Sequence, residues 1–295
     1  MGDRRLGRAT VLTGERGGKY PHGNSLLVEG TEETLVVDPS LSLLVRRAEL
    51  PRVDRVVNSH CHEDHVAGNH LFPDVPWHLH EADLPGIRSL DGLMAIYGFD
   101  AGVAGAFRKV VVEQFHFVPR ADAIAFSDGH VFELGRTRVR VLHAPGHTRG
   151  HCVLLVEPEG VLYLGDIDLS SFGPYYGDAW SDLEDFERTL ARVREIDARH
   201  YATFHHVGVV DGRAAFLERL DRFAAVIADR EARLLAFLAA PRTMEEIAVH
   251  RFVYRPGDPV PYAAPVERRS MGQHVERLVR AGRVREVEPR RFVTT

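Results

Sequence analysis

Cysteine is scarce in this chain, and long apolar runs are missing. Cys61 and Cys152 are the only two cysteines among 295 residues, too few for a disulfide framework. No stretch of about 18 apolar residues occurs, and no basic segment followed by an apolar run opens the chain. With 44% hydrophobic and 27% charged residues, the composition is typical of a soluble globular protein. We therefore expect a cytoplasmic protein without a membrane partner.

Lysine is also scarce, and the net charge is negative. Only Lys19 and Lys109 are lysines among 37 basic residues, and the formal net charge is −5. A chain of this charge is not expected to bind nucleic acid through bulk electrostatics. The C-terminal end differs, because residues 265–295 hold eight arginines and four glutamates, which leaves −9 for residues 1–264. A contact with nucleic acid would therefore lie in this tail.

Histidine is abundant instead, with 17 residues, and its densest group lies at residues 60–65. This segment reads His-Cys-His-Glu-Asp-His. The β-branched stretch 53–59 predicts a buried strand before it, and residues 66–69 predict the first turn of a helix after it. Open α/β sheets place their sites at such carboxyl ends of strands. The segment is therefore the first candidate for a functional site.

The spacing within this segment favours two adjacent metal ions. On an extended backbone His60 and His62 point to the same side, because side chains alternate with a period of two. Once the chain turns helical, Asp64 and His65 are aimed elsewhere. One pair could then bind one metal and the other pair a second. Imidazole and carboxylate ligands suit zinc, iron and manganese.

Three more residues of ligand type follow predicted strands further along the chain. His147 comes after a Pro-Gly turn, Asp166 follows a predicted hairpin, and His205 follows a short strand. Ligands gathered from separate strand ends make a rigid site. The neighbouring His206 is a rival for the last position, where we favour His205.

Other residues give weaker signals for the same site. Asp38 ends a predicted strand, where it could accept a hydrogen bond from a ligand histidine or form a turn with Pro39. His78 and His80 repeat the spacing of the first histidine pair but lack a neighbouring Asp-His pair. We therefore do not count them as ligands.

Helical patterns fill much of the remaining chain. Residues 41–50 predict a helix, and residues 81–112 predict a mostly helical insertion near the site, broken at 98–105. Further helices are expected at 183–197 and 213–239.

The C-terminal segment has a different layout. Thr243 and Glu246 form the pattern of a helix-capping box. A second helix is expected over 270–280, and two short strands over 284–287 and 291–294. Helix, helix and hairpin in this order predict a winged-helix-like unit. Such a unit could dock a second copy of the chain and form a homodimer.

Together the motifs resemble the metallo-β-lactamase superfamily. Residues 60–65 match His-x-His-x-Asp-His, residues 145–151 match Pro-Gly-His-Thr-x-Gly-His, and a Gly-Asp pair and a strand-end histidine follow in the family's order. The resemblance spans residues 9–210 and implies an α/β fold, an αββα sandwich of two mixed sheets with helices outside. We expect this metal-hydrolase domain at residues 1–225 and a small winged-helix-like domain at residues 226–295.

The resemblance also implies a centre of two divalent metal ions. Zinc is the expected ion, with iron and manganese as alternatives. Three histidines would hold one ion, an aspartate and two histidines the other, and a further aspartate would bridge both. In that order the ligands are His60, His62 and His147, then Asp64, His65 and His205, and then Asp166.

Asp166 narrows the class within the superfamily. Antibiotic-degrading members often carry cysteine at this position, whereas a bridging carboxylate resembles glyoxalase II-like thioesterases, lactonases and nucleases. The family's chemistry implies a metal-bridging hydroxide that attacks a carbonyl carbon or a phosphorus atom. Asp64 would be the catalytic residue that orients this nucleophile. Sequence assigns no residue to protonate the leaving group.

Residues near the motifs could contact the substrate. Arg149 could hold a carboxylate or phosphate, or be a solvated loop residue, and His151 is expected to pack beside the site. By resemblance, Phe172, Tyr175 and Tyr176 would line a pocket together with the helical insertion.

Three functions are compatible with these features. The first, which we favour for its bridging carboxylate and negative main domain, is dinuclear-metal hydrolysis of a small-molecule ester, thioester or lactone. The alternative is a metal-dependent nuclease, a phosphodiesterase whose C-terminal domain contacts RNA or DNA. The third is a protein without catalysis, whose metals stabilise the fold while its tail recognises DNA.

Overall fold

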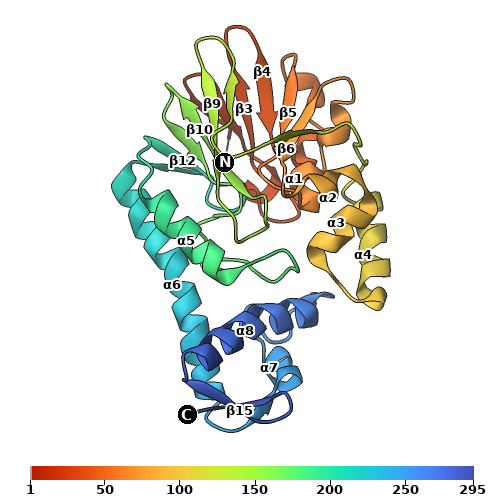
Figure 1. The fold of residues 1–295 in the computed structure, drawn as a ribbon. Coiled ribbons are helices and arrows are strands. Elements are labelled where there is room, and N and C mark those ends of the chain that lie inside the picture. Colours follow the sequence, from red (N-terminus) through yellow and green to blue (C-terminus); the bar gives the residue numbers. More distant parts are fainter. Residues whose placement is uncertain (1) are drawn as a thin grey trace.

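Two β-sheets pack face to face, and helices cover both outer faces (Figure 1). The computed structural model describes residues 2–295. The first sheet holds its strands in sequence order from β1 to β7. Its strands are β1 (Arg4–Leu6), β2 (Ala9–Leu12), β3 (Ser25–Glu29), β4 (Thr34–Val37), β5 (Arg55–Val57), β6 (Trp77–His80) and β7 (Ile124–Phe126).

The second sheet has the order β13-β12-β11-β10-β9-β8. Strands β11 and β12 pair in parallel, and the other neighbours pair antiparallel. Its strands are β8 (Val131–Glu133), β9 (Arg138–His143), β10 (Cys152–Glu157), β11 (Val161–Tyr163), β12 (His200–Ala202) and β13 (Val209–Asp211).

Strand β10 shows how alternation builds the layers. Leu154 and Val156 face the core between the sheets, where they meet residues such as Val57 of the first sheet. Val153 points the other way, into the core under the outer helices. All four side chains are buried. A strand that is apolar on both faces is expected where a sheet is covered on both sides.

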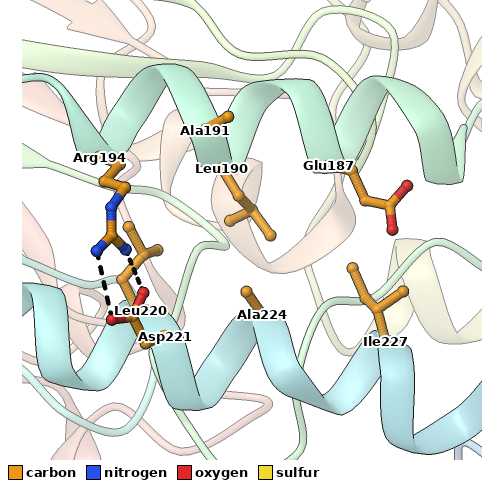
Figure 2. A pocket seen from close by; sticks show the side chains of 8 residues that line it. All are labelled: Glu187, Leu190, Ala191, Arg194, Leu220, Asp221, Ala224 and Ile227. Carbon is orange, nitrogen blue, oxygen red and sulfur yellow. Dashed lines mark hydrogen bonds and ion pairs between the residues drawn. The ribbon is translucent and has the colours of Figure 1, made fainter.

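Each sheet carries its own helical layer. Four helices, α1 (Glu63–Val66), α2 (Leu84–Arg88), α3 (Leu90–Tyr97) and α4 (Ala101–Glu113), contribute to the apolar cluster on the first sheet. Two helices, α5 (Leu183–Arg194) and α6 (Arg213–Phe237), cover the second sheet. These layers give the αββα sandwich that the resemblance implied. Helices α5 and α6 run side by side, with a shallow pocket between them (Figure 2).

Several predicted elements differ from the structure. Residues 41–50 form two short 3-10 turns, η2 (Leu41–Leu43) and η3 (Arg47–Glu49), instead of one helix. The predicted break at 98–105 is shorter, because Asp100 caps the start of α4 and the helix continues through its glycines. Sequence patterns missed the short strands β1, β7, β8 and β13. Two further 3-10 turns are η1 (Glu15–Gly17) and η4 (Asn69–Leu71).

The C-terminal segment forms a small unit below the sandwich (Figure 1). It contains β14 (Arg242–Thr243), α7 (Met244–His250), α8 (Ala263–Arg280), β15 (Val284–Glu288) and β16 (Arg291–Thr294), with strand order β14-β16-β15. The predicted capping box is confirmed, because the Thr243 hydroxyl accepts from the Glu246 amide and the Glu246 carboxylate accepts from the Thr243 amide. The winged-helix assignment stays a prediction. The expected domain boundary after residue 225 falls inside α6, and that division also stays a prediction.

Among the helices of residues 2–295, none is both long enough and apolar enough to span a bilayer.

Candidate metal centre

All seven predicted ligands lie together, in two adjacent groups. They come from segments that follow β5, β9, β11 and β12, so separate loops converge at one edge of the sandwich. Within each group the potential ligand atoms lie within 4.8 Å of one another. The first group is His60, His62, His147 and Asp166, and the second is Asp64, His65 and His205.

In the first group, three ring nitrogens surround one point. His60 Nε2 lies 3.0 Å from His62 Nδ1, and His147 Nε2 lies 3.2 and 2.9 Å from these two atoms. Nitrogens this close cannot all carry protons aimed at one another. A cation that accepts their lone pairs resolves the arrangement, and imidazole is the commonest protein ligand for zinc and similar ions.

In three of the histidines, a hydrogen bond at Nδ1, which faces away from the centre, leaves Nε2 free to bind a metal. His147 Nδ1 donates to the Tyr175 carbonyl oxygen at 3.0 Å, and His205 Nδ1 donates to the Gly18 carbonyl oxygen at 2.9 Å. His65 Nδ1 lies 2.9 Å from an oxygen of Asp38. A proton held on the outer nitrogen leaves a lone pair on Nε2, which points into the centre. The donor set therefore fits a divalent metal.

Asp38 has the supporting role that its position suggested. Its buried carboxylate accepts from the Ser59 amide at 2.7 Å and from the Ser59 hydroxyl at 2.6 Å. Tyr163 donates its hydroxyl to the same carboxylate at 3.0 Å. The Ser59 oxygen lies 3.1 Å from His60 Nδ1. One carboxylate thus orients a histidine of each group, His65 directly and His60 through Ser59.

Asp166 lies between the two groups. Its Oδ1 is 2.8 Å from His65 Nε2 and 3.9 Å from His205 Nε2, whereas its Oδ2 is 3.1 Å from His147 Nε2. One oxygen therefore faces each group. In the second group, Asp64 Oδ2 lies 3.0 Å from His205 Nε2. This is the geometry that a bridging carboxylate needs.

The electrostatics favour positive charge at this centre. Burial opposes ionisation of Asp166, yet His65 and His147 hold the pKa of its carboxyl well below the usual range. Burial likewise opposes a charge on His65, but Asp166 and Asp38 raise the pKa of its ring well above the usual value. In the first group, burial and the neighbouring histidines lower the pKa of His60. The ionised Asp166 carboxylate and the neutral His60 ring are ligand groups for a cation, and the raised pKa of His65 shows that its position favours positive charge.

Two buried residues brace the ligand loops. Asp83 accepts from the Thr148 hydroxyl at 2.6 Å, from the Gly150 amide at 2.7 Å and from the Cys61 amide at 3.3 Å. It joins the His60–His65 loop to the His147 loop, and sequence reasoning missed it. His151 packs beside the centre as expected. It donates through Nδ1 to a backbone carbonyl and accepts through Nε2 from the Asp166 amide at 3.1 Å.

A buried carboxylate with two tyrosines adjoins the first group. Glu63 accepts from the Tyr20 hydroxyl at 2.9 Å and from the Tyr97 hydroxyl. The Tyr97 ring also stacks on His62, with 5.2 Å between ring centroids. Helix α3 of the predicted insertion thus reaches the centre. Neither Glu63 nor the tyrosines carried a sequence signal, because their contacts join segments far apart in the chain.

The remaining sequence candidates lie outside both groups. His206 is exposed, and Arg149 is exposed with its guanidinium 4.8 Å from the Trp180 ring centroid. The expectation for Tyr176 was wrong. Its side chain is fully buried, and its hydroxyl lies 2.8 Å from His274 Nε2 of α8. Tyr175 contacts His147 through both its carbonyl oxygen and its ring, with 5.7 Å between ring centroids. Phe172 packs against Tyr254, with 5.8 Å between ring centroids.

His78 and His80 also lie outside the two groups, buried in β6. His80 stacks on His143 with 4.0 Å between ring centroids, and its Nδ1 accepts from the Ala82 amide at 3.2 Å. Burial, aided by His143, lowers the pKa of His80 to about 4. This ring is therefore held neutral in the folded protein at neutral pH.

The low pKa of His80 predicts part of the acid sensitivity of the fold. An unfolded histidine takes up a proton near pH 6.5, whereas the folded one does so only near pH 4. The free energy of unfolding should therefore fall as the pH drops from about 7 towards 4. A His80→Asn variant keeps an acceptor for Ala82 without titrating. Between pH 7 and pH 5, the free energy of unfolding measured in urea should fall by about 1 kcal/mol less in this variant than in the unmodified protein. Equal losses in the two proteins would contradict this role.

Comparison with known proteins identifies a family and several relatives. The model of the metallo-beta-lactamase superfamily matches residues 20–223. A hydroxyacylglutathione hydrolase of Methylococcus capsulatus is 28% identical over 241 residues, covering 78% of this chain and 80% of that protein. An acyl-coenzyme A thioesterase of Gallus gallus, MBLAC2, is 26% identical over 199 residues, covering 60% of this chain and 69% of that protein.

A solved structure extends the likeness to most of the chain. A metallo-beta-lactamase family protein from Thermus thermophilus superposes with a TM-score of 0.70 at 26% identity, covering 92% of this chain and 94% of that one. The family match, the two ligand groups and the sandwich all agree. The chain therefore belongs to the metallo-beta-lactamase superfamily and is an enzyme, a metal-dependent hydrolase.

Proposed function

We propose that this chain is a two-metal hydrolase of small-molecule thioesters. The observation that carries the proposal is the position of Asp166, with one carboxylate oxygen towards each ligand group. The substrate class is supported by the relatives, which are named for hydrolysis of a glutathione thioester and an acyl-coenzyme A thioester. Zinc is the ion that we expect, with iron and manganese as alternatives.

The seven candidate ligands would have separate roles, which follow from their positions. His60, His62 and His147 would hold one ion, and Asp64, His65 and His205 the other, with Asp166 shared. Two bound divalent ions would supply a water with a pKa near neutrality and polarise the substrate carbonyl. Asp64 would also orient the attacking water. The outer hydrogen bonds of His147 and His205 hold these rings in place during turnover.

The leaving group also favours a thioester. A thiol of the cysteine type has a pKa near 8.5, so its thiolate departs at neutral pH without a proton donor. An alkoxide needs such a donor. The lower pKa of a thiol leaving group therefore favours a thioester over a simple ester.

The nuclease alternative is weaker, because much of the positive tail is neutralised within the chain. Arg277 contacts Glu187 and Glu231, and Arg280 contacts Glu184. Arg269 donates to two backbone carbonyls of α3 and its cap. These arginines pack the C-terminal unit against the sandwich and are not free for a phosphate backbone.

A substrate panel tests the proposed class. The purified enzyme should be assayed with acyl-coenzyme A and acylglutathione thioesters, a lactone and bis-p-nitrophenyl phosphate. We expect kcat/KM for at least one thioester to exceed the values for the lactone and for the phosphodiester by about a hundredfold. This ratio is equivalent to about 2.7 kcal/mol of transition-state stabilisation. Cleavage of the phosphodiester alone would contradict the proposal and support a nuclease.

A further inference from the structure

We propose that the C-terminal helices position the first metal group through residues 172–178, which we call the strap. The strap lies between the ligand loops of the sandwich and helices α6 and α8. One side of it contacts two ligand histidines, and the other side is held by side chains of the C-terminal helices. The inference rests on the two-ion arrangement of the proposed function and assigns a role to residues outside the centre.

On the side of the centre, the strap contacts two of the three histidines in the first group. The Tyr175 carbonyl oxygen accepts from His147 Nδ1 at 3.0 Å. Asp178 Oδ2 lies 3.0 Å from His62 Nε2, and Asp178 is itself buried. The Tyr175 hydroxyl donates to Asp178 Oδ1 at 3.0 Å and links the two contacts. A shift of the strap would therefore move both histidines.

On the opposite side, Arg230 of α6 holds the strap. Its guanidinium donates to the Pro174 carbonyl oxygen at 2.5 Å and to the Phe172 carbonyl oxygen at 2.7 Å. The Arg230 residue is only 1% exposed, and its charge lies 5.4 Å from the Tyr176 ring centroid. A buried arginine is rare unless paired. Here its partners are the carbonyls of Phe172 and of Pro174, the residue directly before Tyr175.

Helix α8 adds a second set of contacts. Gln273 donates to the Tyr176 carbonyl oxygen at 2.9 Å and accepts from the Leu183 amide at 2.7 Å. The buried His274 lies 2.8 Å from the Tyr176 hydroxyl. The strap is thus fixed by two helices that contribute no ligand to the centre.

Helix α6 can position the strap because its own first half is anchored on the sandwich. Leu220, Ala224 and Ile227 face α5 across the shallow pocket, and Arg194 pairs with Asp221 at one end (Figure 2). The second half of the helix leaves the sandwich and runs towards the C-terminal unit (Figure 1). Arg230 lies on this second half.

The second metal group is held by different segments. His205 Nδ1 donates to carbonyl oxygens of Gly18 and His22, and His65 contacts Asp38. None of these partners belongs to the strap. Loss of a partner that orients a ligand histidine lowers metal affinity by about 10- to 100-fold. Loosening the strap should therefore weaken one of two bound ions.

Metal binding by Arg230→Met and Gln273→Met variants tests the inference. Metal-free protein is titrated with zinc against a chromophoric chelator, and cobalt is then used to record ligand-field spectra. We expect one ion to bind about tenfold more weakly in each variant, and the other ion to keep its affinity. The Arg230→Lys variant retains one strong donor and should recover part of the loss.

Arg233→Met is the matched control on the same helix. Arg233 donates to the Phe252 carbonyl oxygen at 2.8 Å, within the C-terminal unit, and makes no contact with the strap. It should reduce thermal stability without changing either metal affinity. Equal weakening of both ions by Arg230→Met and Gln273→Met, or unchanged affinity for both, would overturn the inference. Binding of one ion by the unmodified protein would instead contradict the proposed function.

Discussion

Replacing Asp166 by asparagine should lower hydrolysis at least about a thousandfold, equivalent to about 4 kcal/mol of transition-state stabilisation. The amide keeps the shape of the side chain but offers one weak ligand oxygen in place of two anionic ones. Because Asp166 faces both groups, with contacts of 2.8 Å to His65 and 3.1 Å to His147, one substitution should affect both of the proposed ions. Initial rates with excess zinc, together with metal content, measure the effect.

Asp168→Asn is the control for this substitution. Asp168 lies two residues further along the chain, and its carboxylate accepts from the amide and hydroxyl of Ser170. We expect its activity to stay within about tenfold of the unmodified enzyme, because these hydrogen bonds go to Ser170 and not to a candidate ligand. An Asp166→Asn variant with comparable activity would show that the carboxylate does not bridge two ions.

Replacing Asp38 by alanine should destabilise the fold strongly and weaken metal binding. Asp38 is completely buried, and its carboxylate accepts from Ser59, Tyr163 and His65. Removal leaves several buried donors without partners, at about 1–3 kcal/mol each. We expect a loss of about 4 kcal/mol in the free energy of unfolding, measured in urea, and a fall in affinity of about tenfold or more for the ion at His65.

The Asp38→Asn variant separates the loss of the carboxylate from the strain that alanine would add to the backbone at this position. The residue has a φ of 46°, in the left-handed region that asparagine tolerates better than alanine. Asparagine also keeps one acceptor oxygen for the Ser59 amide. It should therefore lose less than half the stability lost by the alanine variant. An alanine variant within about 1 kcal/mol of the unmodified protein would show that the carboxylate does not hold this network together.

The clustering of the seven candidate ligands could be expected from the sequence because its signals are local. His60, His62, Asp64 and His65 share one strand-to-helix turn, and strand ends elsewhere supply the rest. The structure brings all seven predicted residues together. Their role as ligands stays a prediction that metal titration tests.

Most of the residues that orient the candidate ligands could not be identified from the sequence. Asp83 lies 22 residues from Cys61 and 67 from Gly150, so its contacts arise only after the loops have met. Asp178 and Tyr97 likewise reach His62 from other segments. A single Asp or Tyr has no sequence pattern that distinguishes such a role from solvent exposure.

Short length and long-range contacts also explain where the predicted secondary structure and side-chain positions differ from the structure. The strands β1, β7, β8 and β13 are three residues long, too short for alternation to stand out. By resemblance Tyr176 was expected to line a pocket, but its ring is buried in the apolar cluster under α5 and α6, and its hydroxyl contacts His274 of α8. Its direction depends on residues about a hundred positions away.

The most direct test is a titration of metal-free enzyme with zinc while thioester hydrolysis is followed. Two ligand groups that share Asp166 predict that activity is absent without metal and reaches its plateau at two ions per chain. Removal of zinc with a chelator should reverse the gain. Full activity in the metal-free enzyme, or a plateau at one ion per chain, would contradict the two-metal centre.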